Sequence, residues 1–202
     1  RPIQTIDGGH EVNEVFFDDV EVPYENLIGE ENKGWDYAKF LLGNERTGIA
    51  RVGVSKERLR RIRALASKVE SGGRPVIEDP AFREKLTACE IELKALELTQ
   101  LRVVADEGKH GKGKPNPASS VLKIKGSEIQ QTTTELLMEI IGPFAAPYDE
   151  HGDAGSNESM DWTAQIAPSY FNNRKVSIYG GSNEIQRNII RSEERRVGKE
   201  CR

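Results

Sequence analysis

Five apolar residues recur at alternating spacings of four and three positions, and this pattern constrains the fold more than any other feature of the chain. They are Phe82, Leu86, Cys89, Leu93 and Leu96. Such a stripe is typical of a helix that buries one face against the other helices of a bundle. Asp79 and Pro80 come directly before it, as a helix N-cap and a proline in the first helical position. The segment therefore predicts a long bundle helix that begins near Pro80.

Two more long helices are expected on either side of this one. Apolar residues predict a first helix over about 34–70, and the glycine pair at 72–73 ends it. An Asn-Pro pair at 116–117 repeats the start signal of the middle helix, and a Gly-Pro pair at 142–143 is a stop signal. The sequence thus predicts a third helix between these two pairs.

The last part of the chain contains shorter elements. A short helix is expected over about 163–175, and Ser182 can cap a last helix that runs through Ile190. Residues 191–202 show no apolar period, which predicts a disordered or foreign tail. Together the helices predict a mainly helical fold, an antiparallel bundle that follows a strand remnant.

That strand remnant occupies residues 1–33. Apolar residues among acids predict a strand over Glu14–Val22, and Pro23 ends it because proline cannot donate to a β-ladder. One or two strands cannot form a stable sheet alone, so we expect most of a larger β domain to lie outside this chain. The chain also begins at Arg1 without an initiator Met, and we therefore expect it to be processed or truncated.

Charge and composition exclude several classes of function. Lys and Arg number 29 against 33 Asp and Glu, a formal net charge of -4, which argues against nucleic acid as the main partner. No apolar run approaches the roughly 20 residues that a membrane span needs. Cys89 and Cys201 are too few for a disulfide framework, and the histidines lack the spacing of metal ligands. We expect no metal site and a cytosolic setting.

Three longer segments are more specific than composition. They read VNEVFFDDVEVPYENLIGEENKGW at 12–35, LLGNERTGIA at 41–50 and SIYGGSNEIQRNII at 177–190. In this order and spacing they resemble the flavin-dependent acyl-CoA dehydrogenases, most closely bacterial members such as the pimeloyl-CoA dehydrogenase large subunit. The resemblance implies that residues 1–33 end the middle β domain of the family and that 34–190 form its C-terminal four-helix bundle.

The resemblance also implies a reaction and its partners. A member of this family binds FAD, desaturates an acyl-CoA thioester between its α and β carbons, and passes electrons to an electron-transferring flavoprotein. It forms a homo- or hetero-oligomer, a dimer or a tetramer. The chemistry needs a carboxylate base for the α-proton and a hydrogen-bond donor for the thioester carbonyl, where negative charge develops.

Glu45 is the expected base. Many family members carry the base as a Glu in the last of the three segments, where this chain has Gly180. A minority place it instead in a Glu-Arg pair on the first bundle helix, and Glu45-Arg46 matches that position. Gly43 and Gly48 on either side suggest close approach of a ligand or of another backbone segment. Arg46 either contacts the substrate or has a structural role.

The remaining site residues come from the last segment. The resemblance implies that the backbone N–H of Gly180 binds the thioester carbonyl and that Tyr179 lines the acyl pocket, although a tyrosine there is equally consistent with plain core. Ser182 corresponds to a family threonine that binds the flavin, and it can also cap a helix. Asn183 and Gln186 are weaker candidates for cofactor binding.

Two departures from the family pattern keep other functions open. Residues 69–73 lack the Arg and Phe that usually reach the flavin of a neighbouring subunit, so that Arg74 is the nearest substitute, and Glu139 replaces a usual Gln. These changes resemble heteromeric members, in which only some interfaces hold flavin. The alternatives are therefore a non-catalytic structural subunit of a heteromer and an acyl-CoA oxidase-like enzyme.

Overall fold

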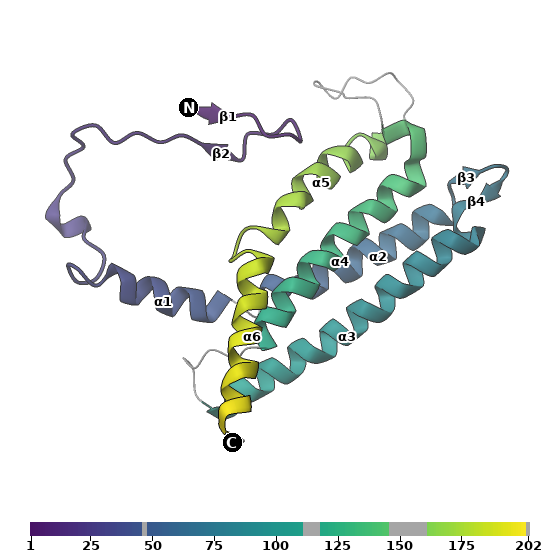
Figure 1. The fold of residues 1–202 in the computed structure, drawn as a ribbon. Helices are drawn as coiled ribbons and strands as arrows, with labels where there is room; N and C mark the ends of the chain where they lie inside the picture. Colours follow the sequence, from purple (N-terminus) through teal and green to yellow (C-terminus); the bar gives the residue numbers. More distant parts are fainter. Residues whose placement is uncertain (46–47, 111–117, 146–160, 201–202) are drawn as a thin grey trace.

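The computed structural model describes residues 1–45, 48–110, 118–145 and 161–200, which form a mainly helical fold with two small strand pairs (Figure 1). The α-helices are α1 (Gly34–Glu45), α2 (Val52–Ala66), α3 (Pro80–His110), α4 (Ala118–Ile141), α5 (Ile166–Asn172) and α6 (Asn183–Glu200). The strands are β1 (Pro2–Ile3), β2 (Val12–Asn13), β3 (Glu70–Ser71) and β4 (Arg74–Pro75). No helix in these ranges is long and apolar enough to cross a bilayer.

Helix α3 confirms the prediction from its apolar stripe. All five stripe residues are buried, and none is more than 4% exposed. The Asp79 carboxylate caps the helix, because its Oδ1 accepts the N–H groups of Ala81 and Phe82 at 2.8 and 3.0 Å. Burial raises the pKa of the Cys89 thiol to about 11, so this cysteine stays a protonated core residue near neutral pH.

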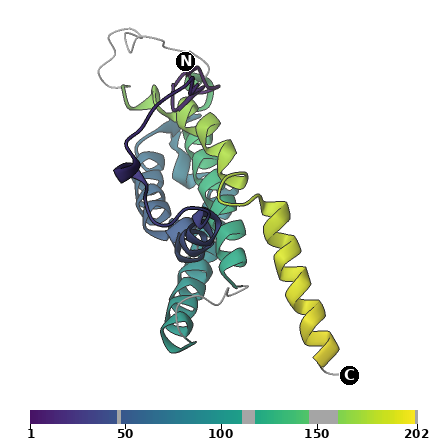
Figure 2. The same cartoon turned by 90° about the vertical axis from the view of Figure 1, so that its left-hand side faces the viewer.

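Helix α4 lies at the centre of the bundle, where it contacts α2, α3, α5 and α6 (Figures 1 and 2). It confirms the predicted third helix, and it ends before Gly142, whose positive φ of 52° is the left-handed conformation of a helix stop. One face of α4 carries the core residues Leu122, Ile129 and Leu136. Another face carries small and polar residues that are just as deeply buried, among them Ser119, Lys123 and Ser127.

The prediction of one long helix over 34–70 is wrong. Helix α1 ends at Glu45, a 3-10 turn, η2, covers Gly48–Ala50, and α2 begins at Val52. Arg51 between them has a φ of 46°, a left-handed conformation that cannot continue a right-handed helix. The predicted break at the glycine pair 72–73 is confirmed, because both residues adopt positive φ in the turn of the β3–β4 hairpin.

The predicted strand over Glu14–Val22 is also wrong. The only strand pair in the described N-terminal segment joins β1 to β2, with Pro2 opposite Asn13. Side chains of the predicted strand are exposed instead, with Phe17 at 82% and Val22 at 69%. The segment has the apolar pattern of a strand, but the described part of the chain offers it no neighbouring strand to pair with.

Polar contacts join the N-terminal segment to the bundle near α5. The Asn172 amide donates to Asp7 Oδ2 and to Glu11 Oε1, both at 2.7 Å. Lys175 forms an ion pair with Glu11. These contacts are largely on the surface, so they orient the segment more than they stabilise it.

The C-terminal part differs from its prediction in one respect. Helix α5 and the 3-10 segment η6 (Asn173–Ser177) occupy the predicted short-helix region. Helix α6 begins after Ser182 as predicted but continues to Glu200, so residues 191–200 are helical rather than disordered, and its end leads away from the other helices (Figure 2). Glu, Arg and Lys are good helix formers, which lets a capped helix extend without an apolar stripe. Residues 201–202 of the predicted tail lie outside the described residues.

Candidate functional site

An open groove of about 570 Å³ lies where the start of α2 meets the turn before α6. Its lining residues are Gly48, Ile49, Arg51, Gly53, Val54, Tyr179 and Gly180. The structure thus brings the 41–50 segment and the 177–190 segment together, although they lie at opposite ends of the bundle sequence. Two of the predicted site residues, Tyr179 and Gly180, line this groove.

The 178–182 turn connects η6 (Asn173–Ser177) to α6 and contributes Tyr179 and Gly180 to the lining of the groove. Gly180 and Gly181 have positive φ angles of 68° and 83°, and both are exposed. The Gly180 N–H has no hydrogen-bond partner among the described residues. A side chain at position 180 would be strained by the positive φ, and its Cβ would overlap Cδ1 of Ile49. Glycine therefore leaves a free N–H where a carbonyl oxygen can approach.

The predicted cofactor residues divide into two groups. Ser182 Oγ accepts the Ile185 N–H at 3.4 Å, which is the capping geometry, and the Gln186 amide donates to the Gly180 carbonyl at 3.4 Å. Both residues lie next to Gly180 in the turn and at the start of α6, where their side chains make only weak contacts of 3.4 Å. Asn183 is not available to a cofactor, because it is 7% exposed and its amide is engaged with Lys123 and Ser127 inside the protein.

The other side of the groove rests directly on α4. A Cβ at Gly126 would lie 2.7 Å from Ala50 Cα and 2.8 Å from the Ala50 carbonyl oxygen. Since both are backbone atoms of η2, no side-chain movement could relieve the contact. Gly126 therefore sets how closely η2, and with it Ile49, approaches the bundle.

Gly126→Ala is expected to lower the free energy of unfolding by about 1–3 kcal/mol, because the added methyl group must push η2 away from α4. Equilibrium unfolding in urea measures the change. Gly53→Ala is the control, since a Cβ there meets nothing within 4 Å and lies inside α2. The free energy of unfolding of Gly53→Ala should exceed that of the parent protein by roughly 0.5–1 kcal/mol. A Gly126→Ala protein as stable as the parent would show that the contact is not tight in solution.

Positive charge borders the groove. Arg51 lines it, and Arg58 lies two turns further along α2, partly buried, with its guanidinium donating to Asn173 Oδ1 at 3.2 Å. Desolvation lowers the pKa of Arg58, and the charge of Arg51 lowers it further. Neither guanidinium has a carboxylate partner among the described residues. This end of the groove thus favours an anionic ligand.

The predicted base and its neighbour are only partly placed. Glu45 is the last residue of α1, and its side chain lies outside the described part of the structure. Arg46 lies outside the described residues altogether. Glu45 precedes Ile49 by four residues, a length of chain that spans at most about 14 Å. The predicted base is therefore on the segment that leads into the groove.

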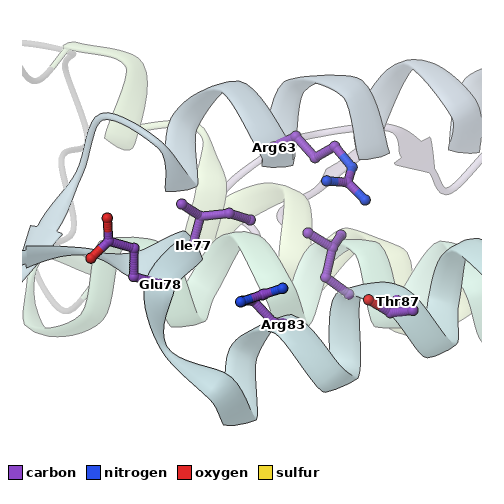
Figure 3. Close-up of a pocket in the computed structure, with 6 residues that line it drawn as sticks. Arg63, Ile77, Glu78, Arg83 and Thr87 are labelled. Atoms are coloured by element: carbon purple, nitrogen blue, oxygen red, sulfur yellow. The ribbon is translucent and has the colours of Figure 1, made fainter.

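A second hollow, of about 400 Å³, lies between α2, α3 and the 3-10 turn η3 (Val76–Glu78). Figure 3 shows Arg63 and Arg83 approaching it from the two helices, with Ile77 and Glu78 at its border. Arg63 is bound by Glu90 through two hydrogen bonds of 2.5 and 2.6 Å. None of the predicted site residues lines this hollow, so it is separate from the groove.

The two departures from the family pattern have simple structural surroundings. Glu139 accepts hydrogen bonds from the Lys85 ammonium at 2.9 and 3.1 Å, an exposed ion pair between α4 and α3. Arg74 is exposed in β4 of the hairpin. Neither residue contacts the groove, and no group of His, Cys, Asp and Glu in the described ranges could hold a metal ion.

Sequence reasoning missed three residues that shape the groove. Ile49 packs against Gly180, and Gly126 allows the backbone of η2 to approach α4 closely. Lys123 donates hydrogen bonds to the residues on either side of the 178–182 turn. Lys123, Gly126 and Ser127 share one face of a helix through spacings of three and four, and that face carries small and polar residues where a core helix should be apolar. This was the available signal.

Comparison with known proteins agrees with the fold and with the three sequence segments. The family model described as "Acyl-CoA dehydrogenase, C-terminal domain" matches residues 32–194. The chain therefore belongs to the acyl-CoA dehydrogenase family. FAD is the cofactor of this family, and two of the predicted site residues, Tyr179 and Gly180, line the groove.

Named relatives extend over nearly the whole chain. "Acyl-CoA dehydrogenase IpdE1" of Mycobacterium tuberculosis is 32% identical over 94% of this chain and 45% of its own length. The long-chain specific acyl-CoA dehydrogenase of Sus scrofa is 30% identical over 89% and 39%. The solved ChsE4–ChsE5 complex of M. tuberculosis has a TM-score of 0.68 at 25% identity, over 94% of this chain and 46% of that one. The chain spans about half the length of the curated relatives it matches.

These relatives correct one detail of the sequence-based interpretation. The named homologues are mycobacterial and mitochondrial acyl-CoA dehydrogenases, and not the pimeloyl-CoA dehydrogenase large subunit. The shared motifs thus identify the family and do not identify a subgroup within it.

Proposed function

We propose that this chain is the C-terminal portion of an FAD-dependent acyl-CoA dehydrogenase that desaturates an acyl-CoA thioester between its α and β carbons. The observation that carries the proposal is the free, exposed N–H of Gly180 in a groove that Ile49 also lines. The expected base, Glu45, lies four residues before Ile49 on the same segment. In this proposal, one ligand receives a hydrogen bond from the Gly180 N–H at its carbonyl and meets the Glu45 carboxylate as its base.

Each residue has a distinct role in this proposal. The Gly180 N–H donates to the thioester carbonyl, where charge builds as the α-proton leaves, and the Glu45 carboxylate accepts that proton. Tyr179 borders the acyl chain, and Arg51 supplies positive charge near the anionic CoA moiety. Ser182 and Gln186 would hold FAD at the turn, and bound FAD supplies the acceptor for the β-hydride.

The partners of the reaction belong to the same proposal. An electron-transferring flavoprotein is the expected electron acceptor, and the protein is expected to act as an oligomer.

Mixing the complete flavoprotein anaerobically with a panel of acyl-CoA thioesters tests the proposal. We expect at least one thioester to bleach the flavin absorbance in a single turnover. A protein that binds flavin but is reduced by none of these thioesters would contradict the proposal. The rates at which the reduced flavin is reoxidised by oxygen and by the electron-transferring flavoprotein distinguish an oxidase from a dehydrogenase.

A second candidate is a subunit that completes a partner's flavin site without reacting itself. Two observations favour it. Asn183 is committed to contacts inside the protein, and Glu139, which replaces the usual Gln, is paired with Lys85. The flavin content per subunit of the intact assembly distinguishes the two proposals, because a catalytic chain binds its own flavin and a structural chain does not.

A further inference from the structure

Lys123 is a buried lysine that the proposed chemistry does not use. It lies on α4 beneath the turn before α6, and only 3% of the residue is exposed. Its ammonium donates to the Ser177 carbonyl at 2.9 Å and to Asn183 Oδ1 at 2.7 Å. One side chain thus reaches across from the central helix to two positions that flank the 178–182 turn.

The buried charge of Lys123 has no carboxylate partner among the described residues; both of its hydrogen-bond acceptors are neutral. Desolvation lowers the pKa of Lys123, and the more distant Glu184 opposes this shift. Burying an ammonium against neutral acceptors costs stability that an apolar side chain of similar size would not. A lysine at this position therefore calls for an explanation beyond packing.

The acceptors of Lys123 are placed so that they fix both ends of the turn. Ser177 precedes the turn and Asn183 follows it as the first residue of α6. Ser127, one helical turn along α4, holds Asn183 from the other side, since the Asn183 amide donates to Ser127 Oγ at 3.0 Å. Between these anchored ends lie Gly180 and Gly181. Glycine has a conformationally free backbone, so these two residues do not hold the turn rigid by themselves.

We propose that Lys123 is a positioning residue that clamps the turn at Ser177 and Asn183, so that Gly180 and its N–H keep their position at the lining of the groove. The catalytic role of that N–H rests on the proposed function. The contacts of Lys123 with the two ends of the turn do not depend on it. An ammonium has three donors on a flexible stem, so it can hold two acceptors at once. A donor kept in place before the reaction stabilises developing charge without having to reorganise.

Lys123→Met tests the clamp, because methionine keeps most of the length and removes all three donors. The matched control is Lys125→Met, an exposed lysine on the same helix that pairs with Glu128 at 2.9 Å. Hydrogen exchange of the hydrogen-bonded amides at the two ends of the turn, those of Ile178, Tyr179 and Ile185, is the first readout. We expect exchange to become on the order of 10-fold faster in Lys123→Met and unchanged in Lys125→Met, since removing the clamp frees local opening of the turn.

Kinetics supply the second readout. In the complete flavoprotein, we expect Lys123→Met to slow single-turnover flavin reduction by about 10–10²-fold, because a small misplacement of the donor has that effect. The dissociation constant for acyl-CoA should change much less, since the donor matters most in the transition state. A loss of binding as large as the loss of rate would mean that Lys123 only maintains the fold.

Asn183→Asp keeps the inference testable if Lys123→Met does not fold. The carboxylate gives the buried ammonium a charged acceptor and strengthens the bond at one end of the turn. Exchange in the turn should therefore become several-fold slower than in the parent protein. Exchange that is unchanged in both Lys123→Met and Asn183→Asp, or in the one that folds, overturns the clamp. A parent flavoprotein that no acyl-CoA reduces would contradict the proposed function and leave the exchange result to decide the clamp alone.

Discussion

Glu45→Gln is expected to slow flavin reduction by acyl-CoA by a factor on the order of 10²–10⁴, the usual contribution of a positioned general base. Glutamine has nearly the same size and keeps hydrogen-bonding capacity, but it cannot accept the α-proton. Binding of acyl-CoA should change little, because the groove residues that contact the ligand remain. Rapid-mixing absorbance measurements on the complete flavoprotein give the rate and the binding constant separately.

A matched control distinguishes loss of the base from a general effect of removing a carboxylate. Glu57→Gln neutralises a carboxylate on α2 that is exposed and paired with Arg60. We expect this variant to reduce its flavin at the rate of the parent protein. If Glu45→Gln also reacted at the parental rate, the base would have to lie elsewhere, and the alternative of a non-catalytic subunit would gain support.

Much of the bundle could be predicted because its signals are local. The stripe from Phe82 to Leu96 and the Asp79 cap depend only on helical periodicity and on hydrogen bonding within one turn, and both are confirmed. The break after Glu45 could not be predicted in the same way. It depends on the left-handed conformation of Arg51, a residue type with no preference for that conformation.

The prediction of a strand over Glu14–Val22 is wrong because strand formation depends on contacts outside the segment itself. Its pattern describes which side chains would be buried in a sheet, whereas strand formation depends on neighbouring strands that the described chain does not contain. The groove could not be predicted in full for the same reason. Motifs identified Tyr179 and Gly180, but the contacts of Gly180 with Ile49 and of Gly126 with Ala50 arise only when distant segments pack. The role of Lys123 was hidden because a lysine is normally expected at the surface.

Moving the base to position 180 tests whether the two family arrangements address the same α-carbon. Gly180→Glu restores the carboxylate of the commoner arrangement, but the structure places two obstacles in its way. The positive φ costs an L-residue roughly 1–2 kcal/mol, and the new Cβ would overlap Ile49 Cδ1. The design therefore adds Ile49→Ala, which removes the overlapping atom. In a Glu45→Gln background, the reference protein is Glu45→Gln with Ile49→Ala.

We expect Gly180→Glu to raise the single-turnover rate of that reference protein on the order of 10-fold with a slender acyl-CoA. A well-placed base contributes about 10²–10⁴, and a displacement of about 1 Å removes roughly 10² of it, so only part of the activity should return. Gly180→Gln in the same background is the control, because it fills the same space without a base. Without the Glu45→Gln change, two carboxylates would lie close together at the same groove, and their repulsion should raise the pKa of one of them. If the glutamate and glutamine proteins both fold, hold flavin and react equally slowly, the carboxylate at 180 does not reach the carbon that Glu45 serves.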